Sequence, residues 1–159
     1  MTLKTRALRL FLMPLLAGPA VACGLQPDLP SEPPPGLEAA WFHDDCAPWD
    51  GPAVSLYLAR ERGGSPFAPG LPYLRVTLYA SSSIGLHEGE RLRFEPGTQG
   101  DAQYCRSMDD CDAATGVGIE FSGVEREVLE GRLEVLFGER PPIRGAFRAG
   151  RMPFQALCG

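Results

Sequence analysis

Lysine is nearly absent from this sequence of 159 residues, because Lys4 is the only one. All other basic side chains are arginines or the two histidines, His43 and His87. Beyond residue 4 the chain therefore offers no lysine for a Schiff base, a phosphate-binding loop or a Ser-x-x-Lys acyl-transfer site. This absence excludes three large classes of enzyme chemistry from the rest of the chain.

Motifs for nucleophiles and structural metals are also scarce. Ser81, Ser82 and Ser83 offer hydroxyl groups, but no G-x-S-x-G sequence is present to position one of them as a nucleophile. No C-x-x-C pair exists, and two histidines are too few to complete the usual zinc motifs. We expect no cofactor and no structural metal.

A few polar residues could still carry chemistry. His43 is followed by two aspartates, as in a base with an orienting carboxylate, and His87 precedes Glu88 in a predicted turn. The loop that holds Asp109, Asp110 and Asp112 could bind an ion weakly, although it does not follow the EF-hand pattern. We interpret all of these residues as solvated surface, and the alternative function is a small hydrolase that uses His43 or His87.

The first 22 residues have the layout of a secretory signal. Three basic residues, Lys4, Arg6 and Arg9, precede thirteen uncharged residues that end in Ala22. Thirteen residues span roughly 20 Å as a helix, short of the ~30 Å hydrocarbon core of a bilayer. A permanent transmembrane helix is therefore disfavoured, and residues 1–22 are predicted to be removed.

The four residues Ala20-Val21-Ala22-Cys23 resemble the lipobox of bacterial lipoproteins, although leucine is commoner at the position of Ala20. The resemblance implies cleavage before Cys23 and a diacylglyceryl group on its thiol. Two or three acyl chains make membrane attachment effectively permanent. Gly24 stands where an aspartate retains lipoproteins in the inner membrane of two-membrane bacteria, which indicates the outer membrane. The alternative is ordinary signal peptidase cleavage, which releases a soluble protein.

Residues 23–40 are predicted to form the lipidated N-terminus and a tether rich in proline. The tether has no apolar period, and in polyproline geometry its 17 residues after Cys23 could reach roughly 50 Å. A docking motif for a partner is the alternative. From Cys23 onward the chain has 12 basic and 20 acidic residues, a net charge of −8. This balance disfavours nucleic acid and anionic headgroups as partners.

Residues 41–159 are predicted to be a single all-β domain. Apolar and polar residues alternate with period two over 54–58, 73–79, 91–94, 117–121, 132–137 and 143–148. The segment 102–106 is a weaker strand. The segment 123–130 could form a short helix, but we predict one strand. We expect six to eight short antiparallel strands, the last two forming a hairpin, in a sandwich or a small barrel. The sandwich is preferred.

Four cysteines follow Cys23, and an even number in an exported chain predicts two disulfides. Cys105 and Cys111 flank five residues that read as a turn, so we expect them to pair across a hairpin. Cys46 and Cys158 bracket the domain and are expected to join its ends.

Tyr57, Tyr73 and Tyr79, together with Arg75, fall on the strand faces opposite the leucines. If the leucines form the core, these four residues point outward and have the composition of a contact surface. The alternative is that tyrosine simply favours strands and here packs against a second layer or the tether. We therefore predict a lipid-anchored, non-catalytic module that binds an unknown protein or ligand through its β surface.

Overall fold

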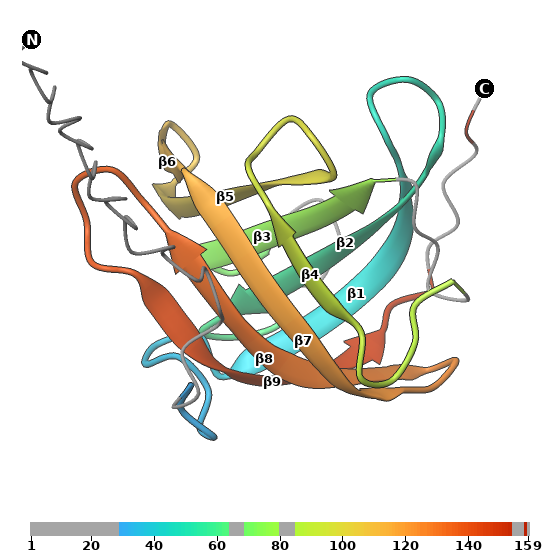
Figure 1. Cartoon of the computed structure of the whole chain (residues 1–159). Helices are drawn as coiled ribbons and strands as arrows, with labels where there is room; N and C mark the ends of the chain where they lie inside the picture. Colours follow the sequence, from blue (N-terminus) through green and yellow to red (C-terminus); the bar gives the residue numbers. More distant parts are fainter. Residues whose placement is uncertain (1–28, 64–68, 80–84, 154–157, 159) are drawn as a thin grey trace, which may run out of the picture.

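The computed structural model describes residues 29–63, 69–79, 85–153 and 158, and these residues form an all-β domain (Figure 1). The nine strands are β1 (Ala39–Cys46), β2 (Pro52–Ala59), β3 (Tyr73–Tyr79), β4 (Arg91–Phe94), β5 (Gly100–Ser107), β6 (Asp110–Ala113), β7 (Gly116–Val124), β8 (Val128–Leu136) and β9 (Ile143–Arg151). The all-β prediction is confirmed. In the described part of the chain no helix could serve as a membrane span.

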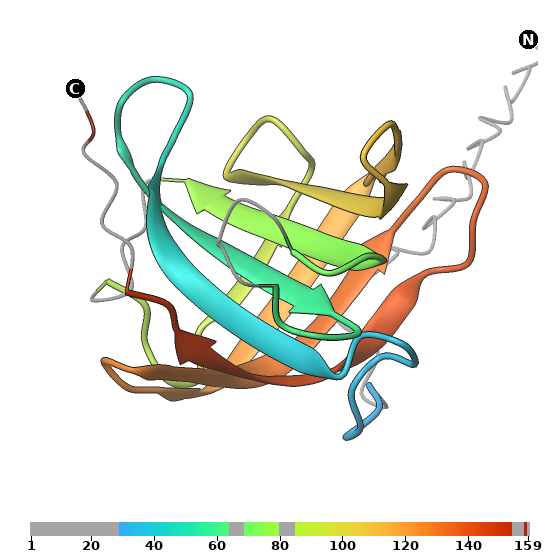
Figure 2. The same ribbon diagram turned by 180° about the vertical axis from the view of Figure 1, so that it is seen from behind.

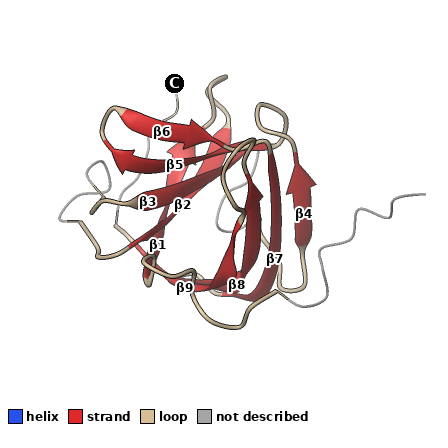
Figure 3. Cartoon of the chain, turned by 90° about the vertical axis from the view of Figure 1, so that its left-hand side faces the viewer, coloured by secondary structure: helices blue, strands red, loops and turns tan. Residues whose placement is uncertain are grey.

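The nine strands form one continuous sheet in the order β4-β7-β8-β9-β1-β2-β3-β5-β6. This single sheet curls into a half-barrel rather than the preferred sandwich, with β4 at one edge and β6 at the other (Figure 3). Ala114 and Thr115 connect β6 to β7, and their amides donate hydrogen bonds to Ala102 of β5 and Leu136 of β8. This link joins the two halves of the curled sheet.

The strands differ from the expected set in three ways. There are nine rather than six to eight, because β1 and β6 lie outside the segments with the clearest alternation. The sheet is mixed, since β1 pairs with β9 in parallel while the other seven pairs are antiparallel. The segment 123–130 is not one strand: it contains the turn between β7 and β8, where Glu125 N donates to Val128 O at 2.8 Å.

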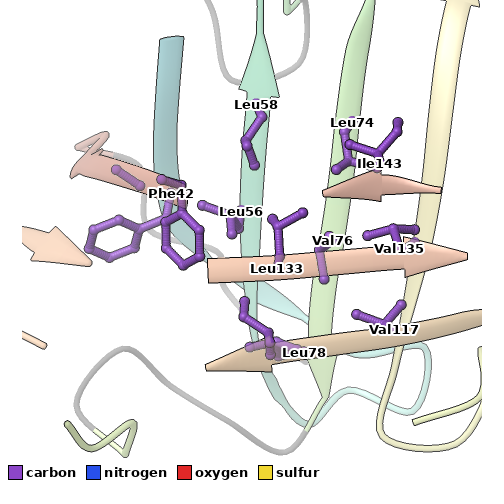
Figure 4. Packing of buried hydrophobic residues seen from close by; sticks show 14 of the residues in the cluster. Phe42, Leu56, Leu58, Leu74, Val76, Leu78, Val117, Leu133, Val135 and Ile143 are labelled. Atoms are coloured by element: carbon purple, nitrogen blue, oxygen red, sulfur yellow. The ribbon is translucent and has the colours of Figure 1, made fainter. Parts of the chain in front are cut away.

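The core fills the inside of the curl. Alternate residues of β2 and β3 point inward and meet alternate residues of β7, β8 and β9, as Figure 4 shows for Leu56, Val76 and Leu133. These three side chains are at most 1% exposed. The alternation in the sequence therefore identified the inward faces, because period two places every second residue on the same side of a strand.

The segment 29–38, which the sequence assigns to the tether, packs against the domain. Leu29 and Leu37 are 7% and 3% exposed, and Ala146 N donates a hydrogen bond to Glu32 O at 2.8 Å. Of the β9 residues, only Gly150 and Arg151 pair with β1. The segment 29–38 lies along the part of the β9 edge that β1 leaves unpaired. Residues 29–40, which the sequence analysis assigned to the tether, therefore belong to the folded domain.

Candidate functional site

An aromatic layer lies on the outer face of β1, β2 and β3. These three strands are nearest the viewer in Figure 2. Trp41 stacks on Tyr57 with a centroid distance of 5.5 Å, and Tyr57 in turn stacks on His43 at 5.6 Å. Met152, from the chain that follows β9, packs into the same cluster. Trp41 is completely buried and Tyr57 is 6% exposed, so both faces of this part of the sheet are covered.

A row of polar side chains continues this layer. The hydroxyl of Ser55 donates to Asp45 Oδ2 at 2.6 Å and lies 2.9 Å from the hydroxyl of Thr77. The other carboxylate oxygen of Asp45 accepts a hydrogen bond from Cys46 N at 2.8 Å. Ser55 is fully buried, so these bonds satisfy groups that have lost water.

The two buried tyrosines of this layer have raised pKa values. Burial and a hydrogen bond to Asp101 raise the pKa of Tyr79 to about 12. Burial also raises the pKa of Tyr57, although the nearby Arg75 opposes the shift. Both phenols therefore remain protonated and act as structural hydrogen-bonding groups.

The predicted contact surface of Tyr57, Tyr73, Arg75 and Tyr79 is not formed as a surface. The four residues share the outer face of β2 and β3, as the alternation requires. However, Tyr57 and Tyr79 are buried, and only Tyr73 and Arg75 are partly exposed. The tyrosines do lie on the face opposite the leucines, but the expectation that this face is open to water was wrong for Tyr57 and Tyr79, because other residues of the domain cover it.

The residues considered for a hydrolase are not brought together as a dyad. His43 is 1% exposed, and its Nδ1 lies 2.9 Å from the backbone carbonyl of Asp44, whose carboxylate instead pairs with Arg151. His87 lies in an exposed turn, where its backbone N donates to Glu90 Oε2 at 3.0 Å. Ser81, Ser82 and Ser83 fall outside the described residues.

Two carboxylates of the acidic loop, those of Asp110 and Asp112, form ion pairs with arginines. Arg106 forms two hydrogen bonds of 2.7 Å with the carboxylate of Asp110 and an ion pair of 3.3 Å with Asp112. The arginine lowers the pKa of the Asp110 carboxyl, and the Asp110 carboxylate raises the pKa of Arg106. Within the described ranges no three His, Cys, Asp or Glu residues are grouped to hold a metal ion.

A depression of about 640 Å³ opens beside this loop, between the β5–β6 hairpin and the turn from β8 to β9. Arg106, Asp112, Phe137 and Arg140 line it. The guanidinium of Arg140 lies 3.7 Å from the ring centre of Tyr104 and 5.0 Å from that of Phe137. We regard this depression, which we name the Arg140 depression, as the candidate site.

Arg140 combines a buried donor that has no partner in the described part of the chain with a guanidinium that is partly exposed to this depression. Its Nη1 lies 3.4 Å from Asp112 Oδ2, but its buried Nε has no hydrogen-bond partner among the described residues. A stacked arginine is restricted in orientation, and the exposed part of its guanidinium can donate to a carboxylate or carbonyl oxygen. Sequence analysis missed Arg140, because a lone arginine in a turn carries no periodic or motif signal.

Both disulfides join the pairs that the sequence analysis expected. Cys105 and Cys111 are partners across the β5–β6 hairpin, and Cys46 at the end of β1 is bonded to Cys158. The first bond fixes the hairpin beside the Arg140 depression, and the second closes a loop with a sequence separation of 112. Cys23 lies outside the described residues.

No family model, curated protein or solved structure matches this chain.

Proposed function

We propose that this chain is the precursor of a lipoprotein of the cell envelope, anchored by acyl chains on Cys23 and held in the outer membrane. The observation that carries the proposal is the sequence Ala20-Val21-Ala22-Cys23 after a basic and then apolar leader. The core cluster of the folded domain runs from Leu37 to Ala149, so cleavage before Cys23 removes none of its residues.

The second part of the proposal is that the domain binds a partner and does not catalyse a reaction. The Arg140 depression supports binding, because it combines a stacked, partly exposed guanidinium with an aromatic wall. Arginine and tyrosine are the residues that most often anchor protein interfaces. The partner that fits is one that presents a carboxylate or carbonyl oxygen with an adjoining apolar group.

The hydrolase alternative receives no support from the geometry of the described residues. His43 is buried, and the hydroxyl of Ser55, its partner across the strand pair, donates to Asp45 instead. A hydrolytic activity that disappears in His43→Ala or His87→Ala would nevertheless favour the enzyme.

Metabolic labelling with a fatty acid tests the anchor. We expect the wild-type protein to incorporate the label and to fractionate with membranes, and Cys23→Ser to do neither. Unchanged labelling and fractionation in Cys23→Ser would contradict the lipoprotein proposal.

Site-specific photo-cross-linking tests the binding site. A cross-linking amino acid at Glu139, an exposed residue that lines the Arg140 depression, should give discrete adducts in the native membrane. Arg140→Gln should abolish these adducts, because it removes the charge and the planar fork of donors. Arg126→Gln is the matched control, since Arg126 lies in the exposed turn between β7 and β8. Adducts that survive Arg140→Gln would rule out this depression as the binding site.

A further inference from the structure

Charge is unevenly distributed around the half-barrel. The outward positions of β4, β7, β8 and β9 carry five arginines and three glutamates, and we name this surface the arginine face. Its arginines are Arg91, Arg93, Arg132, Arg144 and Arg148, and its glutamates are Glu120, Glu130 and Glu134. The rest of the chain from Cys23 onward carries seven arginines against seventeen acidic residues. A protein with a net charge of −8 thus has one face with a net positive charge.

The three glutamates of the arginine face are paired with arginines across neighbouring strands. Arg91 pairs with Glu120 at 2.9 Å, and Arg148 pairs with Glu130 at 2.6 Å. Arg144 pairs with Glu134 at 2.5 Å. Arg132 is exposed and forms no ion pair with the residues that the structure describes, so the pairing leaves a positive excess.

The N-terminal end of the described chain lies on the same face. Ser31 and Pro33 border a depression of about 370 Å³ that Glu130, Arg132 and Arg148 also line. Leu29 is buried and stands six positions after Cys23. Six residues reach at most about 20 Å even when fully extended. Cys23, the proposed site of the lipid, is therefore no farther than about 20 Å from Leu29.

We infer that the arginine face lies against the phosphate headgroups of the bilayer that holds the lipid on Cys23. The inference rests on the proposed lipidation. It is supported by the short chain between Cys23 and Leu29 and by the complementary charge of guanidinium and phosphate groups. Each arginine close to an anionic bilayer strengthens such a contact about fivefold, an effect that falls with ionic strength.

Energy transfer to a labelled lipid in reconstituted vesicles tests the inference. The full lipidated protein is placed in phosphatidylcholine vesicles that contain phosphatidylglycerol and an acceptor lipid. A donor dye is attached to a cysteine introduced by Ser122→Cys on the arginine face or by Gln103→Cys on the outer face of β5. We expect the stronger transfer from position 122. The double variant Arg132→Gln with Arg148→Gln should lower the energy transfer from position 122. High salt should lower this transfer by a similar amount, and vesicles without phosphatidylglycerol should lower it too.

The double variant Arg60→Gln with Arg62→Gln is the matched control, because it removes the same charge from exposed residues after β2. It should leave the transfer from position 122 unchanged. Flotation of the vesicles separates the two proposals. A protein that does not float with the vesicles overturns the lipidation and with it this inference. A protein that floats but shows equal transfer from both positions, or an equal response to both double variants, overturns the inference alone.

Discussion

The indole ring of Trp41 lies almost parallel to the phenol ring of Tyr57, with centroids 5.5 Å apart and planes that differ by 3°. The two residues are partners in the β1–β2 ladder, and both point away from the main core. Their burial gives the domain a second apolar layer outside the sheet. The layer explains why tyrosines on these strands are structural residues.

Tyr57→Ala should lower the free energy of unfolding by about 3 kcal/mol or more, the usual cost of deleting a buried aromatic ring. Urea unfolding measures the loss. Tyr57→Phe should lower the free energy of unfolding much less, because phenylalanine keeps the aromatic ring. Trp49→Ala is a second control, since Trp49 is 56% exposed. A Tyr57→Ala protein as stable as the wild type would restore the idea that the outer face of β2 is a contact surface.

Stability should fall at high pH because of Tyr79. Its pKa is raised to about 12 in the folded protein, compared with about 10 in an unfolded chain. The folded state therefore holds the phenolic proton more tightly, and this contribution is complete below pH ~10 and is lost as the pH rises towards 12. Urea unfolding at several pH values between about 10 and 12 should show this loss of stability, and the loss should be smaller in Tyr79→Phe. The part that remains in Tyr79→Phe would come from Tyr57, whose pKa is also raised.

The long disulfide should stabilise the fold more than the short one. A loop of order 100 residues predicts about 4.7 kcal/mol from chain entropy, whereas a loop of about six residues predicts roughly 2 kcal/mol. The paired variants Cys46→Ser/Cys158→Ser and Cys105→Ser/Cys111→Ser can be compared by urea unfolding. A greater loss in the hairpin pair would show that strain or packing outweighs loop entropy here.

Gly145→Ala should displace the segment 29–38 from the domain. A Cβ at Gly145 would lie 2.6 Å from both Cδ and N of Pro34, so the new methyl group and the segment cannot occupy the same space. We expect a loss of about 1–3 kcal/mol, as for other overpacked sites, and faster hydrogen exchange at the amide of Ala146. Gly150→Ala on the same strand is the matched control, because nothing lies within 4 Å of its added Cβ. Equal hydrogen exchange at the Ala146 amide in Gly145→Ala and Gly150→Ala would mean that the packing of the segment 29–38 does not depend on Gly145.

Much of the fold was predictable from local patterns. The alternation around Leu56, Leu74 and Leu133 identified inward faces correctly, because these residues are buried in the main core. The turn between Cys105 and Cys111 predicted a hairpin closed by their disulfide. β1 was missed because its outward positions carry Trp41 and His43, so apolar and polar residues do not separate onto opposite faces.

The sequence alone predicts the leader and the lipobox, and it determined the alternation of the strands, because each of these is a pattern of neighbouring residues. The even number of cysteines after Cys23 follows from composition alone. The tertiary structure decided which faces of these strands are covered by other parts of the domain. A period of two predicts which residues share a face but not whether that face is exposed to water. The burial of Tyr57 depends on its cluster with Trp41 and Met152, and Tyr79 is buried in a separate cluster with Ala47 and Ala53. Net charge likewise carries no information about position, and only the curled sheet brings Arg91, Arg132 and Arg148 to one side of an acidic domain.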